Sequence, residues 1–191
     1  MGHFAEANSG STILTRRRFV RLVTLAGASL MAGPALAGLS VTRGREKALS
    51  FYNLHTGESL RTVYWTSDGY DATALGQINY ILRDFRANEV KPIDVRLLDL
   101  LHSLRQRLDT NEPYQVISGY RSPATNAMLH ANSEGVAAHS LHIDGKAIDI
   151  RVPGRDLSEL HRVALSMRGG GVGYYPRSDF VHVDVGRVRF W

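Results

Sequence analysis

Two short apolar segments late in the chain carry ionisable side chains at alternate positions, and this pattern constrains the fold more than any other feature. In residues 146–152, two isoleucines and a valine alternate with a face that contains Asp149. In residues 181–185, three valines alternate with His182 and Asp184. Successive side chains of a strand point to opposite faces, so each segment is predicted to be a strand. Because an unpartnered buried carboxylate costs several kcal/mol, we expect adjacent strands to aim Asp149 and His182 into one cleft.

His142, Asp149 and His182 form a candidate zinc site. Catalytic zinc is held by three protein ligands and keeps one position open, whereas structural sites are closed by four ligands. The chain has no cysteine, so any ligands must be nitrogen and oxygen atoms. His142 would enter from the loop before the strand, where Gly145 permits a sharp turn. Two alternatives stay open: ordinary hydrogen-bonded histidines, and a divalent ion other than Zn2+.

The first 37 residues have the features of an export signal. Three consecutive arginines at 16–18 precede Phe19, an apolar run covers residues 22–31, and a small-residue Ala-Leu-Ala site ends at Ala37. This combination is typical of a secretory signal, and the arginines followed by Phe19 resemble the twin-arginine type. The expected organisation is therefore a signal peptide at 1–37 and one domain at 38–191. The alternative is an uncleaved membrane anchor, although the apolar run is short for a span of about 20 residues.

Composition limits the class of protein. With 191 residues, of which 43% are hydrophobic and 21% charged, the chain has the size and composition of a single soluble domain. Removal of the signal would take away four arginines and one glutamate, which lowers the formal charge from +5 to +2. No block of basic residues interleaved with aromatic ones remains, so we expect no binding of nucleic acid. Without disulfides, stability must come from the core and from any metal.

Apolar periodicity predicts an α+β fold with a mainly antiparallel sheet. The expected strands are a hairpin over about 48–65, strands at 114–119 and 146–152, and two or three short strands after residue 171. The expected helices follow the apolar positions of 75–85 and 97–108 and cover about 124–131 and 157–167. Asp156 and Glu159 have the spacing of a capping box at the start of the last helix.

Several motifs resemble those of the M15 zinc peptidases that act on bacterial cell-wall peptides. They are the segments 140–149 and 182–184, together with Ser-Gly-Tyr-Arg-Ser-Pro-Ala-Thr-Asn at 118–126. A closer similarity to the MepK-like branch of periplasmic murein endopeptidases rests on residues 53–58, 83–88 and 169–177. The resemblance runs from about residue 49 to residue 191, and its motifs occur in family order.

This resemblance implies a hedgehog/DD-peptidase-like fold, in which a small sheet flanked by helices carries a zinc cleft. It also implies a periplasmic, zinc-dependent endopeptidase that hydrolyses amide bonds in the stem-peptide cross-links of peptidoglycan, with an adaptor lipoprotein as a possible partner. One alternative is a carboxypeptidase or dipeptidase that releases a D-amino acid from the same wall peptides. Another is a non-catalytic murein-binding domain that is stabilised by zinc.

The resemblance also implies roles for residues near the metal. Arg121 would stabilise the developing oxyanion, although it could instead form a surface ion pair. Two carboxylates compete to be the general base. Asp179 stands three positions before the last histidine ligand, as the base does in many M15 peptidases, whereas strand parity favours Asp184, which shares a face with His182.

A second group of polar residues would orient Arg121 and the substrate. It consists of Ser118, Ser122, Asn126 and Ser140. His139, three positions before His142, could orient substrate, donate a proton or act as a fourth ligand. The remaining histidines of the domain are interpreted as surface or core residues: His55, His102, His130 and His161.

Overall fold

The computed structural model describes residues 46–132 and 136–191, all within one compact unit, Val41–Trp191. The expected signal peptide at 1–37 lies outside the described residues. No helix in the described ranges has the length and apolar character that a membrane span requires.

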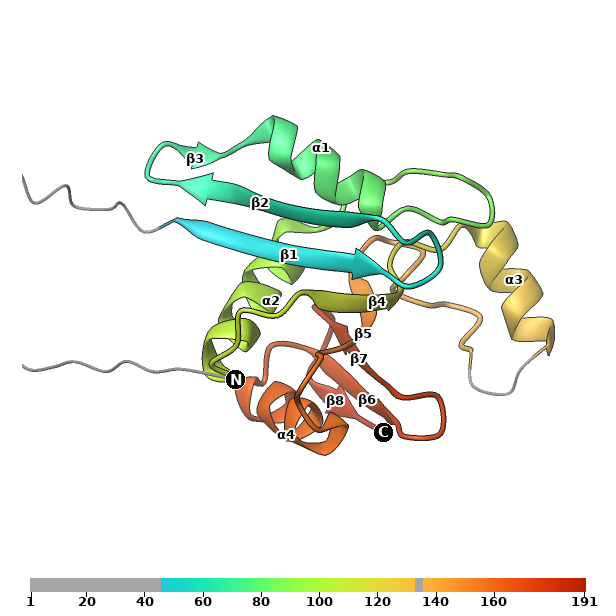
Figure 1. Cartoon of the computed structure of the whole chain (residues 1–191). Helices are drawn as coiled ribbons and strands as arrows, with labels where there is room; N and C mark the ends of the chain where they lie inside the picture. The colour runs from blue at the N-terminus through green and yellow to red at the C-terminus, as the bar shows by residue number, and fades with distance from the viewer. Residues whose placement is uncertain (1–45, 133–135) are drawn as a thin grey trace, which may run out of the picture. The chain divides into compact units, whose positions relative to one another are not determined.

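The described residues form one eight-stranded sheet and four helices (Figure 1). The strands are β1 (Lys47–Asn53), β2 (Ser59–Thr66), β3 (Gly69–Tyr70), β4 (Tyr114–Ser118), β5 (Ala147–Arg151), β6 (Gly171–Tyr175), β7 (Phe180–Asp184) and β8 (Arg189–Phe190). The helices are α1 (Ala72–Ile81), α2 (Val95–Arg107), α3 (Pro123–Asn132) and α4 (Leu157–Met167). The spatial order of the strands is β3-β2-β1-β4-β5-β7-β6-β8.

The predicted α+β class and the mainly antiparallel sheet are confirmed, but the expectation of a small sheet is wrong. Two parallel pairings enlarge it. Strand β1 pairs parallel to β4, with Phe51 opposite Tyr114, and so joins the N-terminal hairpin to the central strands. Strand β8 pairs parallel to β6, with Phe190 opposite Val172. Periodicity identifies strands, but it does not identify which distant strands pair.

Helix α1 is shorter than its apolar pattern predicts. Leu82 is its C-cap, so Phe85 lies beyond the helix and stacks on His55 with ring centroids 4.1 Å apart. The chain turns because the carboxylate of Asp84 accepts hydrogen bonds from local backbone N–H groups and from the distant N–H of Ser122, at 2.9 Å. The hydrogen bonds that the buried Asp84 carboxylate makes to two loops therefore end the helix, although the apolar pattern of the sequence continues.

The N-cap of α4 lies at the predicted residue, but the predicted side-chain capping is not observed. Asp156 is the N-cap residue, but its side chain makes no capping hydrogen bond. The helix ends at Arg168 in the left-handed region, with φ of 51°, just before the glycine run at 169–171. The helix therefore ends just before the glycine run, as the sequence predicts, but the left-handed residue that ends it is Arg168 and not a glycine.

The hydrophobic core lies between one face of the sheet and helices α1, α2 and α4. The alternation predicted for β5 and β7 is observed. Ile148, Ile150, Val181 and Val183 are all buried in this core. The residues between them in sequence occupy the opposite face of the sheet, which leaves that face for polar chemistry.

Gly119 fixes the loop that follows β4 against the end of α1. The N–H of Tyr120 donates to the carbonyl of Leu82 at 2.7 Å. A Cβ at Gly119 would lie only 2.4 Å from the carbonyl oxygen of Leu82. This close approach positions the segment that contains Arg121.

We expect Gly119→Ala to lower the free energy of unfolding by about 1–3 kcal/mol, because the added methyl group must push two backbone segments apart. The matched control is Gly76→Ala, since a Cβ at this exposed position of α1 meets nothing within 4 Å. That control should be neutral or stabilising by about 0.5–1 kcal/mol. Urea denaturation of both variants measures the difference; equal effects would contradict the close approach.

Candidate metal centre

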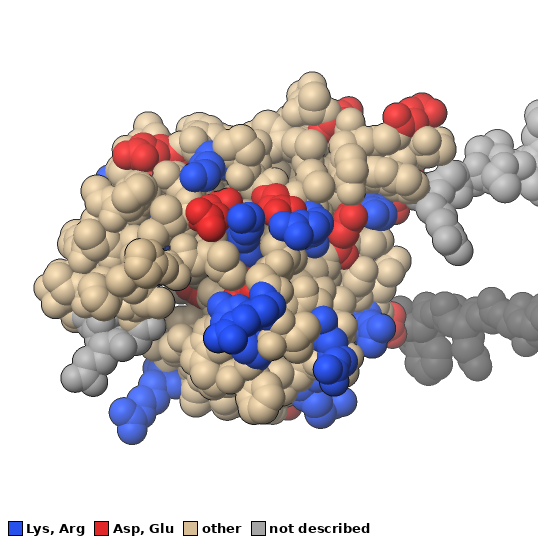
Figure 2. Space-filling model, turned by 180° about the vertical axis from the view of Figure 1, so that it is seen from behind, with Lys and Arg blue, Asp and Glu red and all other residues tan. Residues whose placement is uncertain are grey.

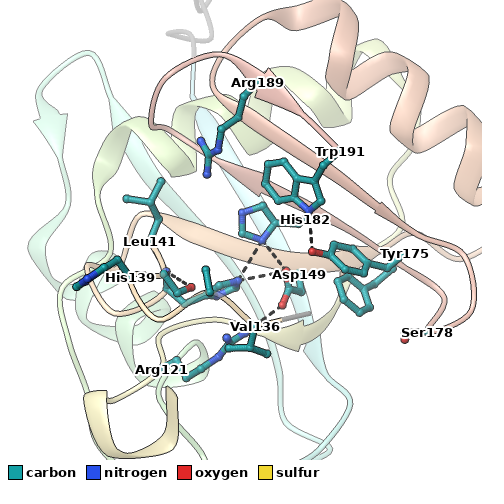
Figure 3. Close-up of a pocket in the computed structure, with 14 residues that line it drawn as sticks. Arg121, Val136, His139, Leu141, Asp149, Tyr175, Ser178, His182, Arg189 and Trp191 are labelled. Carbon is teal, nitrogen blue, oxygen red and sulfur yellow. Dashed lines mark hydrogen bonds and ion pairs between the residues drawn. The ribbon is translucent and has the colours of Figure 1, made fainter. Parts of the chain in front are cut away.

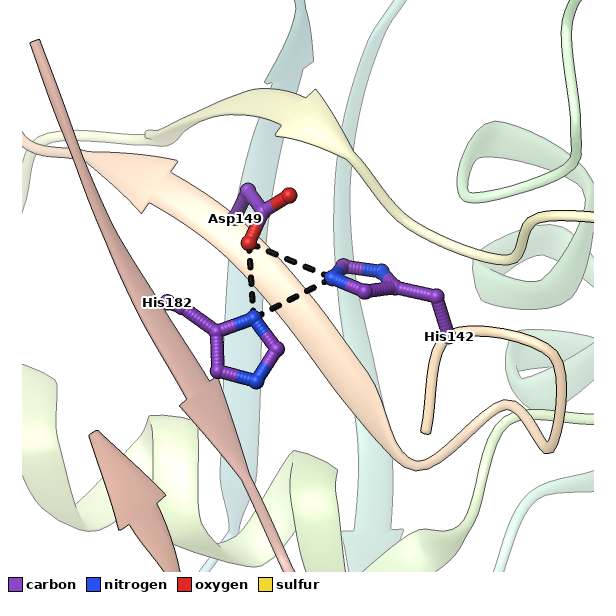
Figure 4. A group of neighbouring side chains, drawn as sticks. All are labelled: His142, Asp149 and His182. Atoms are coloured by element: carbon purple, nitrogen blue, oxygen red, sulfur yellow. Dashed lines mark hydrogen bonds and ion pairs between the residues drawn. The ribbon is translucent and has the colours of Figure 1, made fainter. Parts of the chain in front are cut away.

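Three side chains far apart in sequence meet on the polar face of the sheet (Figure 4). Asp149 and His182 are direct neighbours across the β5–β7 pair, and His142 reaches them from the turn before β5. The His182 Nδ1–Asp149 Oδ1 distance is 2.8 Å, and His142 Nε2 lies 3.2 Å from each of these two atoms. All three residues are buried. The structure thus brings together the three ligands that the sequence predicts.

His142 lies outside the sheet, in the turn at 141–145 that precedes β5. Gly145 has a φ of +67°, which favours glycine, and a Cβ there would lie 2.5 Å from the carbonyl oxygen of Pro92. The carbonyl of His142 accepts hydrogen bonds from the N–H groups of Gly145 and Arg121, both at 3.2 Å. The backbone of the ligand is therefore tied to both flanking segments.

Hydrogen bonds behind the two histidines leave His142 Nε2 and His182 Nδ1 facing the centre. His142 Nδ1 lies 2.7 Å from the carbonyl oxygen of Gly119, which only accepts, so Nδ1 carries the proton and Nε2 has a lone pair. His182 Nε2 lies 3.1 Å from Asp184 Oδ2 and donates to it, which leaves Nδ1 to face Asp149. Partners of this kind fix the tautomer and orientation of metal-binding histidines.

The surroundings of His182 favour its protonated form. Burial lowers the pKa of His182, but hydrogen bonds to Asp149 and Asp184 outweigh it and raise the pKa to about 9. Burial also lowers the pKa of His142, which stays neutral. The pKa of Asp149 is lowered, because the neighbouring histidines outweigh its burial. In the metal-free protein the charge is therefore a proton on His182, and a metal cation can replace that proton.

The donor set fits zinc. Ligands at zinc distances of about 2.0–2.1 Å in tetrahedral geometry are separated by about 3.3 Å, close to the observed distances between the three atoms. Two imidazoles and one carboxylate provide only three ligands, so the fourth position remains for water or substrate. The fit rests on donor chemistry and spacing, which other divalent ions can share.

The three ligands lie at the base of a cleft of about 440 Å³ (Figure 3). One wall comes from the segment 136–141, and the other comes from β6, β7 and the end of the chain. The residues of the second wall are Tyr175, Ser178, Phe180, Arg189 and Trp191.

Arg121 is buried beside the candidate ligands and not exposed at the surface. Its NH2 group donates to Asp149 Oδ2 at 3.4 Å and to Ser118 Oγ at 3.3 Å, and its NH1 group donates to Asn126 Oδ1 at 3.3 Å. Burial lowers its pKa, while the charge of Asp149 opposes that shift. Its Nε is buried with no hydrogen-bond partner among the described residues. The guanidinium is therefore a fixed cation with unused donor capacity.

The predicted orienting residues divide into two groups. Ser118 and Asn126 contact Arg121, and Asn126 also donates to two carbonyl groups of the cleft wall, at residues 137 and 138. Ser122 acts elsewhere, because its hydroxyl caps the start of α3. His139 and Ser140 line the cleft, and the Oγ of Ser140 accepts from the N–H of His142 at 3.4 Å. His139 is exposed.

The two candidate bases occupy different environments. Asp184 is fully buried, and its oxygens accept from His182, from Arg189 and from two glycine N–H groups, at 171 and 186. Asp179 lies in the β6–β7 turn with a φ of 54° and forms an ion pair with Arg151 at 2.5 Å. Neither carboxylate lines the cleft.

Sequence reasoning missed the aromatic wall of the cleft. Tyr175 and Trp191 are 16 residues apart, and no local spacing connects them. The available signal was Gly173 in the glycine-rich motif at 169–177. A Cβ on Gly173 would lie 2.7 Å from the indole of Trp191, so this glycine makes room for the ring.

The chain is similar to known proteins of one family. Residues 41–191 match the Peptidase_M15_2 family, which is described as peptidoglycan L,D-endopeptidase MepK. The chain is 48% identical over 177 residues to the peptidoglycan L,D-endopeptidase MepK of Escherichia coli (strain K12), an alignment that covers 92% of this chain and 96% of that protein. It is 40% identical over 178 residues to the probable peptidoglycan L,D-endopeptidase MepK of Haemophilus influenzae, covering 92% and 95%.

The raised pKa of His182 predicts that the stability of the metal-free protein depends on pH in a range where that of the metal-loaded protein does not. The stabilising proton is fully bound below the ordinary histidine pKa of 6.5 and is lost as the pH rises through about 9. The melting temperature of chelator-treated protein should therefore fall between pH 6.5 and 9. Zinc-loaded protein should not show this fall, because the cation replaces the proton.

Scanning calorimetry across this range measures both forms. His182→Gln should remove the slope from the chelator-treated protein. If the melting temperature falls with pH by the same amount with and without zinc, then zinc does not replace the proton on His182.

Proposed function

The chain belongs to the M15 peptidase family of peptidoglycan endopeptidases, and from this premise we propose that it hydrolyses amide bonds in the stem-peptide cross-links of peptidoglycan. The observation that carries the proposal is the convergence of His142, Asp149 and His182 at the base of an open cleft. One relative named above is a peptidoglycan L,D-endopeptidase by name and the other is named a probable one, and the alignments cover nearly their whole length.

The proposed metal is zinc, held by His142 Nε2, Asp149 Oδ1 and His182 Nδ1. When bound, it would supply Lewis-acid activation of water and of the scissile carbonyl at neutral pH. The protein's own contribution begins with positioning. The carbonyl of Gly119 and the carboxylate of Asp184 hold the two imidazoles, so the donor atoms are in place before any ligand arrives.

Arg121 is proposed to stabilise the negative charge that develops on the scissile carbonyl oxygen. Its side chain is held by Ser118, Asn126 and Asp149 on the cleft side of the ligands. Because the guanidinium is buried and fixed, it needs little reorganisation when charge develops nearby. Its lowered pKa is still that of an arginine, which keeps its charge at neutral pH.

The proposed proton acceptor is His139. Apart from the two candidate ligands, it is the histidine among the described residues that lines the cleft, and imidazole is the side chain that most often acts as a general base. Asp184 is instead proposed to orient His182, since its oxygens are already occupied and no part of it is exposed. Asp179 would have to leave its ion pair with Arg151 to take part.

The charge distribution suits an anionic substrate. Residues 151–191 contain seven arginines and four acidic residues, and one of these acids, Asp184, is buried. In Figure 2 basic side chains dominate the lower part of the molecule, at the height where α4 and β8 lie in Figure 1. Stem peptides of peptidoglycan carry free carboxylates, which such a surface attracts over a range of about 10 Å.

The proposed cellular location of the protein rests on its N-terminal segment. We propose that residues 1–37 direct export by the twin-arginine route and are then removed, which would place the domain in the periplasm beside its substrate. The arginine cluster at 16–18, the apolar run and the small-residue site support this order of events.

Zinc-loaded protein should release uncross-linked products from purified cross-linked muropeptides, as measured by liquid chromatography with mass spectrometry. His142→Ala should abolish this release, because two ligands do not hold the metal in place. The matched control is His161→Ala, since His161 lies on α4 and stacks on Tyr174 away from the candidate ligands. It should retain activity within about twofold of the wild type.

The product distinguishes the alternatives. Release of a terminal D-amino acid without loss of cross-links would identify a carboxypeptidase. Binding to sacculi and zinc-dependent melting without any hydrolysis would identify a non-catalytic murein-binding domain, and would end the endopeptidase proposal.

Three single variants separate the roles of the remaining side chains. His139→Ala should lower kcat by about 100-fold with full zinc content, the usual size of a lost proton-transfer group. Asp184→Asn should lower zinc affinity by about 10–100-fold, because it acts through His182. Asp179→Asn should change kcat by less than about threefold. If Asp179→Asn instead removes activity while zinc is retained, the acceptor is Asp179.

A further inference from the structure

The hydroxyl group of Tyr175 lies in the wall of the cleft, and neither the sequence patterns nor the family comparison gives it a role. Its side chain comes from the end of β6 and is half-buried. Figure 3 shows the hydroxyl pointing toward the candidate ligands from the aromatic wall. Tyr175 and Arg121 line the same cleft. The hydroxyl is therefore close to the proposed reaction centre.

The direction of the hydroxyl proton follows from its one described partner. Trp191 Nε1 lies 2.7 Å from the Tyr175 oxygen. An indole N–H can only donate, so the tyrosine oxygen must be the acceptor in this bond. The hydroxyl proton then points away from Trp191 and has no acceptor among the described residues. The result is an O–H donor oriented by the protein and left free at the cleft.

Packing fixes the ring that carries this donor. The rings of Tyr175 and Phe180 face each other across the β6–β7 pair, with centroids 4.5 Å apart and an interplanar angle of 19°. On its other side the ring is held by the indole bond. A phenol on a fixed ring loses little rotational freedom when it binds an acceptor, so the bond it makes contributes more to affinity.

Trp191 is itself fixed and belongs to the same wall. Its backbone N–H donates to the carbonyl of Val172, and its carbonyl accepts from the N–H of Tyr174. Its indole lies 5.2 Å from the ring of His182 and 5.0 Å from the guanidinium of Arg189. The indole that orients Tyr175 therefore also packs against a candidate metal ligand.

We propose that the Tyr175 hydroxyl is a substrate-binding group that donates a hydrogen bond to a carbonyl or carboxylate oxygen of the stem peptide, and that Trp191 is the positioning residue that directs it. The proposal rests on the proposed function, because it names a contact made by the same cleft. Arg121 and Tyr175 would then both contact the peptide, one as a charged donor and the other as a neutral donor.

The test compares Tyr175→Phe with Tyr174→Phe. Both remove one phenolic oxygen, but Tyr174 stacks on His161 and does not line the cleft. Tyr175→Phe should lower both the affinity of the metal-free protein for purified muropeptides and kcat/KM by up to about tenfold, the size of one neutral hydrogen bond. Zinc content and melting temperature should stay unchanged. Tyr174→Phe should match the wild type.

A double-mutant cycle tests the positioning role of Trp191. Trp191→Phe keeps an aromatic ring but removes the N–H, so Tyr175 loses its orientation and affinity should fall by a smaller factor than in Tyr175→Phe. The double variant should bind no more weakly than Tyr175→Phe alone, because Trp191 acts through the hydroxyl. If the affinity of the double variant falls by the product of the two single-variant factors, the positioning role of Trp191 is overturned.

The binding measurements keep this proposal separate from the proposed function. If the wild type binds muropeptides but does not cleave them, the endopeptidase proposal fails, and the affinity ratio of Tyr175→Phe to wild type still decides the role of the hydroxyl. Equal affinity in Tyr175→Phe and wild type overturns the proposal. So does the absence of muropeptide binding by the wild type.

Discussion

The buried carboxylate of Asp149 is the constraint on which the rest of the structure depends. It lies in the sheet, between two imidazoles and a guanidinium, and only 5% of its surface is exposed. Such a group is stable only if cationic or hydrogen-bonding partners are held close to it. The fold provides these partners from three separate segments, which explains why the turn at His142, the loop at Arg121 and strand β7 all meet at one point.

A second layer of contacts holds those partners. The loop of Arg121 is tied down by Asp84 and by the close approach of Gly119 to Leu82. His182 is held from behind by Asp184, which in turn is saturated by Arg189 and by backbone N–H groups. Hydrogen bonds therefore hold the side chains on the polar face in fixed rotamers. Side chains that are already fixed need to move less when charge develops during a reaction, and this favours catalysis.

Much of the site could be predicted from the sequence because it is encoded locally. Strand parity in residues 146–152 and 181–185 identified Asp149 and His182, and the same alternation identified the core face. Contacts between distant segments could not be predicted in this way. The parallel pairing of β1 with β4 and the bond between Trp191 and Tyr175 depend on topology. Parity also could not show that the oxygens of Asp184 are fully occupied, since that depends on Arg189 and two glycines.

The position of Trp191 gives the protein an intrinsic optical reporter. The chain contains two tryptophans, and the other, Trp65, lies on β2 beneath the ammonium of Lys47. The indole of Trp191 is 5.2 Å from the ring of His182. A protonated imidazole quenches indole emission by accepting an electron from the excited state, whereas an imidazole bound to zinc, a closed-shell ion, does so less effectively. The emission of Trp191, which adds to that of Trp65, is therefore expected to change with the cation at the centre, without any added dye or label.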